Sequence, residues 1–136
     1  MVPGVRAAEA LLRLLGPDGL PRLEVFIAHG VPENFTGAVR RSGASHVLII
    51  DAAAAGHRPG TIFLVDPAAI PDQDVSTHRT SLSVLVDYLQ KTAACNVTAL
   101  GIEPAVFDTG APLSPAVRQA VGRAAGWLAR FAVLRL

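Results

Sequence analysis

The stretch His46-Val-Leu-Ile-Ile-Asp51 decides the fold class of this chain. Its central residues are aliphatic without polar alternation, which is typical of a strand covered on both faces, as in a parallel sheet between helices. In such sheets, ligands and reactive groups collect beyond the carboxyl ends of the strands. Asp51 stands at that end, followed by the small residues Ala52 to Ala55. The stretch therefore predicts an α/β fold and a candidate acid, although a strand-end Asp also commonly caps the next turn.

The segments on either side of this strand alternate between helical and strand patterns. We expect further strands over residues 23–27, 61–65 and 96–102, and helices over residues 5–15, 32–42, 76–94 and 114–131. The first helix should end at Gly16-Pro17, and the last should begin with Ser114 as its N-cap. This order predicts a three-layer α/β/α domain that comprises residues 1–136, with a twisted, mostly parallel sheet.

The spacing of apolar residues predicts which face of each helix is buried. In the first helix the expected face comprises Val5, Ala8, Leu12 and Leu15. In the third it comprises Leu82, Leu85, Val86 and Leu89. In the last it comprises Val117, Val121, Ala124, Leu128 and Phe131, with Trp127 at its margin.

The composition narrows the class of protein. The 136 residues are 51% hydrophobic, enough for one domain with a substantial core. Lys and Arg number 12 against 11 Asp and Glu, without a block of like charge, which argues against nucleic acid or a membrane surface as a partner. The single cysteine, Cys95, excludes an internal disulfide, and we expect it to be buried and inert. With no long apolar run and no signal-peptide pattern, a cytoplasmic protein is expected.

Asp51 and His78 are the residues most suited to chemistry. His78 falls at the start of the third helix, where the helix dipole favours the neutral imidazole that binds metal ions. A carboxylate and an imidazole are suitable ligands for Zn²⁺ or Ni²⁺. Catalytic sites usually have three protein ligands, however, so a purely structural role for each residue stays open. No Gly-x-Ser-x-Gly elbow and no glycine-rich phosphate loop is present, which disfavours a triad hydrolase and a nucleotide-binding protein.

Several motifs together resemble the hydrogenase maturation endopeptidases that process hydrogen-evolving [NiFe] hydrogenases. The motifs follow the family's order and cover nearly the whole chain. They are Val31-Pro-Glu-Asn-Phe35, the strand end at Asp51-Ala, Pro59-Gly-Thr-Ile with Asp66-Pro67, Ser76-Thr-His78-Arg-Thr-Ser-Leu82, Gly101-Ile-Glu-Pro104 and Leu113-Ser-Pro-Ala-Val117. Each motif alone is weak, but the ordered set is fairly specific.

The resemblance implies a function and a set of site residues. In that family, a metal site recognises nickel already inserted in the [NiFe] hydrogenase large-subunit precursor, and a C-terminal extension is then cleaved from that partner. Asp51 and His78 correspond to two of the family's metal ligands. Glu33 corresponds to the acid of the Pro-Glu-Asn motif and is expected to support catalysis by orienting the cleft. Nickel would arrive with the precursor, and zinc or cadmium could substitute for it.

The chain departs from the family pattern at its start. The family begins with a strand and a Gly-Asn…Asp-Asp-Gly loop that supplies the first ligand, whereas Gly4-Val-Arg-Ala-Ala resembles the segment after that loop. We therefore expect an uncovered strand edge, and either marginal stability or a partner chain, such as a second copy in a homo-oligomer, that covers the edge. Two functions stay open: a metal-dependent endopeptidase, impaired to an unknown degree, and a non-catalytic module that binds nickel or the precursor.

Overall fold

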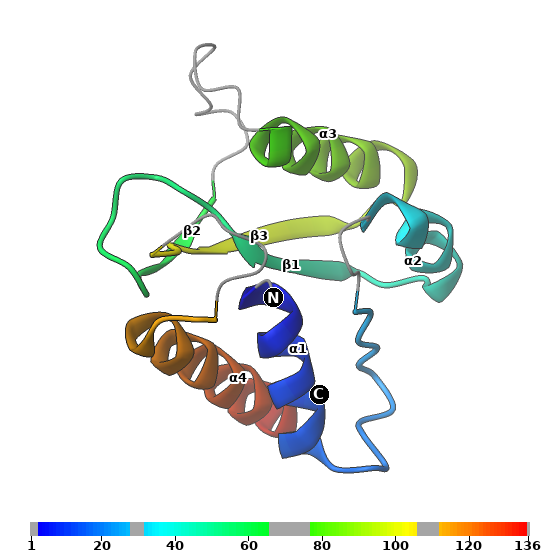
Figure 1. The fold of residues 1–136 in the computed structure, drawn as a ribbon. Coiled ribbons are helices and arrows are strands. Elements are labelled where there is room, and N and C mark those ends of the chain that lie inside the picture. The colour runs from blue at the N-terminus through cyan, green and yellow to red at the C-terminus, as the bar shows by residue number, and fades with distance from the viewer. Residues whose placement is uncertain (1–2, 28–31, 66–76, 106–111, 136) are drawn as a thin grey trace.

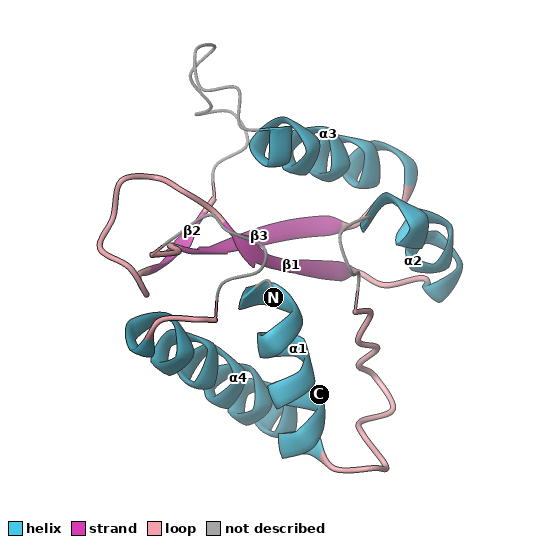
Figure 2. Ribbon diagram, viewed as in Figure 1, coloured by secondary structure: helices cyan, strands magenta, loops and turns pink. Residues whose placement is uncertain are grey.

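The computed structural model describes residues 3–27, 32–65, 77–105 and 112–135, and the side chains of residues 5–27, 34–65, 85–105 and 112–134. Helices and strands are interspersed along these ranges (Figure 2), and most lie where the sequence predicted them. In chain order they are α1 (Pro3–Leu15), the short 3₁₀ helix η1 (Pro32–Phe35), α2 (Thr36–Ser42), β1 (His46–Ala52), β2 (Ile62–Leu64), α3 (Thr77–Thr92), β3 (Asn96–Ile102) and α4 (Pro115–Arg135).

The strands form a sheet in the order β1-β3-β2. β1 and β3 are parallel, with His46 opposite Asn96 and Ala52 opposite Ile102. β2 runs antiparallel to β3, so the sheet is mixed. Figure 1 shows α3 on one face of the sheet, α1 and α4 on the other, and α2 beside the end of the sheet, where it contacts α3. This arrangement confirms the expected α/β/α layers.

β1 lies at an edge of the described sheet, and the prediction that it is buried on both faces was wrong. Leu48 is 41% exposed, and Val47, Ile49 and Ile50 are only partly buried. The central strand is β3, in which Ile102 is fully buried. The physical reason is pairing, since within the described ranges β1 has a neighbour only on the side of β3. An apolar edge of this kind is a template for further strand pairing.

The predicted strand over residues 23–27 is also wrong, because this segment has no regular secondary structure. Its side chains do follow the expected alternation: Leu23, Val25 and Ile27 are partly buried, whereas Phe26 is exposed. The ring of Phe26 packs against Phe35 at a centroid distance of 5.4 Å. A strand also requires a ladder of hydrogen bonds to a neighbour, and no described segment provides that ladder here.

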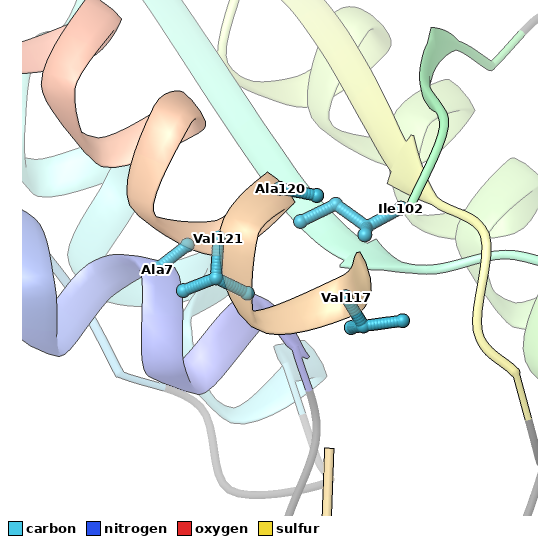
Figure 3. Close-up of a cluster of buried hydrophobic side chains, with 5 residues drawn as sticks. All are labelled: Ala7, Ile102, Val117, Ala120 and Val121. Atoms are coloured by element: carbon cyan, nitrogen blue, oxygen red, sulfur yellow. The ribbon is translucent and has the colours of Figure 1, made fainter. Parts of the chain in front are cut away.

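The core between the sheet and the layer formed by α1 and α4 contains mainly small side chains. Ala7 of α1, Ile102 of β3 and Val117, Ala120 and Val121 of α4 form one buried cluster, drawn in Figure 3. A second cluster on the opposite face joins Val86 of α3 to Ala99 of β3. The buried residues of α3, Leu85, Val86 and Leu89, agree with the predicted face.

Two predicted helix faces required correction. In α1, Ala7 and Leu11 are buried, whereas Leu12 is 41% exposed. In α4, Val117, Val121 and Ala124 are buried as predicted, but Phe131 is 59% exposed and Ala132 is buried in its place. Small alanine side chains allow α1 and α4 to pack closely. The buried face of each helix is therefore centred on its alanines, and the larger Leu12 and Phe131 are exposed to solvent.

The beginning of α4 yields a stability prediction. Ser114 Oγ accepts a hydrogen bond from the Val117 N–H at 3.3 Å, which confirms the expected N-cap. Replacing Ser114 with alanine should lower the free energy of unfolding by about 1 kcal/mol in urea titrations, because a helix-terminal donor loses its partner. Ser45→Ala is the control, since Ser45 is exposed in a loop and its hydroxyl bonds to the exposed His46. Equal losses in both variants would contradict the capping role.

Candidate metal site

Asp51 lies at the carboxyl edge of the sheet, as the sequence predicted. It is the penultimate residue of β1 and pairs in register with Gly101 of β3. The side chain is partly buried, and its Oδ1 accepts a hydrogen bond from the N–H of Ala52 at 2.8 Å. Asp51 therefore sits where the two parallel strands end, with its carboxylate oriented in part by its own backbone.

His78 is the second residue of α3, as predicted from the hydroxyl-rich helix start. α3 leads through residues 93–95 into β3 and packs on it through Val86 and Ala99. The helix must therefore run back along the strand, and Figure 1 shows it beginning at the end of the sheet to which β1 and β3 point. The backbone of His78 and the carboxylate of Asp51 thus lie toward the same edge. The side chain of His78 is outside the described residues, so its role as a ligand stays a prediction.

The backbone beside Asp51 is closely packed. A Cβ added to Gly101 would lie 2.6 Å from Cζ of Phe63 and 2.9 Å from Cβ of Ala53. The ring of Phe63 in turn contacts the imidazole of His57 at a centroid distance of 4.7 Å. Because position 101 is glycine, the Phe63 ring of β2 can pack against β3 at the residue that pairs with Asp51.

Glu103 is a residue of this edge that the sequence reasoning did not select. It follows β3 directly and is 6% exposed, the only buried charged residue in the described part of the chain. Its Oε2 accepts a hydrogen bond from the Ala55 N–H at 2.8 Å, and its Oε1 accepts one from the Gly56 N–H at 3.2 Å. Its position as an acid at the carboxyl end of a strand, like that of Asp51, is the signal that could have identified it.

The remaining candidate residues either lie away from this edge of the sheet or have side chains outside the described ones. Glu33 belongs to η1, directly before α2, and its side chain is not among the described ones, so its supporting role stays a prediction. His46 is exposed at the amino end of β1, where its ring contacts Ser45 and Asn96. Cys95 is buried, as expected. Among the described residues, no three His, Cys, Asp or Glu side chains gather into a group able to hold a metal ion.

Comparison with known proteins shows which protein family this chain matches. The sequence pattern of the HycI hydrogenase maturation protease family matches residues 5–130. The chain belongs to the hydrogenase maturation protease family.

Relatives and solved structures of this family agree with the assignment. A hydrogenase maturation protease homologue of Methanocaldococcus jannaschii is 29% identical over 119 residues, 85% of this chain and 70% of the relative. The hydrogenase 3 maturation protease of Escherichia coli is 33% identical over 101 residues, 71% of this chain and 64% of that protein. The chain thus spans about two thirds of the length of these relatives.

The solved structures show that the fold is shared. The crystal structure of a [NiFe] hydrogenase maturation protease from Thermococcus kodakarensis superposes with a TM-score of 0.84 at 22% identity, covering 96% of this chain and 82% of that one. These findings confirm the family resemblance and the α/β architecture of this hydrogenase maturation protease family member. Within the described residues, no helix has the length and apolar character needed to span a membrane.

Proposed function

We propose that this chain acts as a nickel-dependent endopeptidase that removes the C-terminal extension of a [NiFe] hydrogenase large-subunit precursor. The family match over residues 5–130 supports the reaction class. The observation that carries the proposal for this chain is the shared edge, because β1 delivers Asp51 to the same end of the sheet at which α3 begins. Carboxylate and imidazole are donors that suit nickel and would also accept zinc or cadmium.

The proposed roles divide between the chain and its substrate. The nickel belongs to the precursor, and when bound it would supply Lewis acidity and a fixed anchor for the chain to be cut. Asp51 and His78 would bind the metal and orient the precursor, so that only a nickel-loaded subunit is positioned for cleavage. Glu33 would support the cleft from η1, the segment before α2.

Incubation of the chain with nickel-loaded and nickel-free precursor tests the proposal. Mass spectrometry should detect a released C-terminal peptide only from the nickel-loaded precursor, because the metal completes recognition. Cleavage of both forms at the same rate would refute nickel dependence. A nickel-loaded precursor that neither binds nor is cut at excess chain would refute the function.

A non-catalytic binding module is the second candidate function. The observation that favours it is that no three His, Cys, Asp or Glu side chains within the described ranges gather into a group able to hold a metal ion. This candidate requires that the chain retain the nickel-loaded precursor on a column while the precursor stays intact. Release of the C-terminal peptide in the same experiment would exclude it.

A further inference from the structure

Glu103 holds both limbs of the loop that follows β1, residues 53–61. Its carboxylate binds the outgoing limb through the N–H groups of Ala55 and Gly56. Its backbone binds the returning limb, since its N–H donates to Thr61 O at 2.9 Å and its carbonyl accepts from the Gly60 N–H at 2.8 Å. One residue at the end of β3 therefore sets the shape of this loop.

The burial of Glu103 makes this arrangement rigid. A carboxylate that is 6% exposed is costly unless hydrogen bonds compensate its lost hydration. Here the compensation comes from two neighbouring backbone N–H groups, and Gly56 adopts a positive φ of 81° where they converge. Charge-assisted bonds of this kind are stronger than neutral ones. Displacement of the loop would leave the carboxylate buried without partners, so the loop is held in place.

The same loop begins at the candidate ligand. The Ala53 N–H donates to Ile102 O at 3.2 Å, which extends the pairing of β1 with β3 by one residue. Just before it, the Ala52 N–H donates to Asp51 Oδ1. The orientation of the Asp51 carboxylate thus depends in part on the Ala52 N–H, and the backbone of residues 52 and 53 continues directly into the limb that Glu103 binds.

We propose that Glu103 is a positioning residue, which fixes the loop over residues 53–61 and thereby orients Asp51 for metal binding. The proposal rests on the metal-binding part of the function proposed above. Glu103 does not touch the metal in this role. It acts through the backbone between Ala55 and Asp51, as outer groups commonly do when they orient a ligand.

Glu103→Ala and Glu103→Gln test the proposal against Val86→Ala as a matched control. Val86 is 3% exposed in the cluster of α3 and β3, so its truncation destabilises the fold without touching the loop. Glu103→Gln keeps the side-chain shape but directs an amide NH₂ toward a backbone N–H, and it serves if Glu103→Ala does not fold. Nickel affinity, measured by calorimetry where all variants are folded, should fall roughly 10- to 100-fold in Glu103→Ala and less in Glu103→Gln. Val86→Ala should retain the parent affinity.

NMR provides a readout that does not depend on nickel. In Glu103→Ala the Ala55 and Gly56 amides should lose protection from hydrogen exchange, and the His57 ring protons should leave the field of the Phe63 ring. The Asp51 Cγ chemical shift should also move, while all three signals stay in place in Val86→Ala. An unchanged Asp51 shift, or a nickel affinity equal to that of Val86→Ala, would overturn the positioning role. If the parent chain binds no nickel, the proposed metal function fails, and the Asp51 shift alone decides the role of Glu103.

Discussion

Alanine at Asp51 or at His78 is expected to weaken nickel binding by this chain by about 100-fold or more, because each change removes one of the two proposed protein ligands. Such a loss corresponds to about 2.7 kcal/mol of binding free energy. Asp51 is the penultimate residue of β1, and His78 lies in the first turn of α3 toward the same edge of the sheet. Calorimetric titration with Ni²⁺ measures the effect directly, and the rate of release of the precursor's C-terminal peptide should fall in parallel.

Two controls match the residue types. Asp87 lies on the exposed face of α3 and pairs with Lys91 at 2.8 Å, and His46 is exposed at the amino end of β1. Asp87→Ala and His46→Ala should leave the nickel affinity within about twofold of the parent, since surface substitutions away from a site have small effects. If the controls lose as much affinity as Asp51→Ala and His78→Ala, the site lies elsewhere.

The double variant tests whether the two residues bind the same ion. If they do, a second alanine should cost much less in the variant that has already lost one ligand, because ligands of one site act as a unit. Independent, additive losses would indicate two separate weak sites. That result would contradict the proposed pairing of Asp51 with His78 even if each residue alone affects the affinity.

Replacement of Gly60 by alanine is expected to destabilise the fold by about 3 kcal/mol, the combined cost of a positive φ and an overpacked contact. Gly60 has a φ of 86°, and an added Cβ would lie 2.5 Å from the carbonyl oxygen of Ala116 in α4. That oxygen belongs to the first turn of a long helix and cannot shift alone. The loop is equally constrained, because the Gly60 N–H donates to Glu103 O at 2.8 Å.

Gly56→Ala is the matched control for this change. Gly56 has a similar φ of 81°, but an added Cβ would meet nothing within 4 Å. Its substitution should cost only the conformational term, about 1–2 kcal/mol. Chemical denaturation of both variants separates the two contributions, and equal losses would show that the contact between the loop and α4 has no energetic role.

The local pattern of the sequence was sufficient for most elements. The aliphatic run before Asp51 and the segment over residues 96–102 became β1 and β3. The Ser114-Pro115 pair marked the start of α4, and the apolar spacing in α3 identified its buried face. These features depend on neighbouring residues alone, through capping, periodicity and side-chain shape, so the sequence carries them directly. The family's ordered motifs added the fold and proposed Asp51 and His78 as ligands, which stays a prediction.

Tertiary structure decided how these elements are used. The pairing of strands shows that β1 lies at an edge of the described sheet. It also shows that residues 23–27 do not form a strand, since a hydrogen-bond ladder requires a partner from elsewhere in the chain. Only packing shows that Ala7, rather than the larger Leu12, faces α4. The hydrogen bonds of Glu103 could likewise not be predicted from the sequence, because its partners Ala55 and Gly56 lie 48 and 47 residues away along the chain. Contacts between distant residues depend on how the layers assemble, and no short-range pattern in the sequence encodes them.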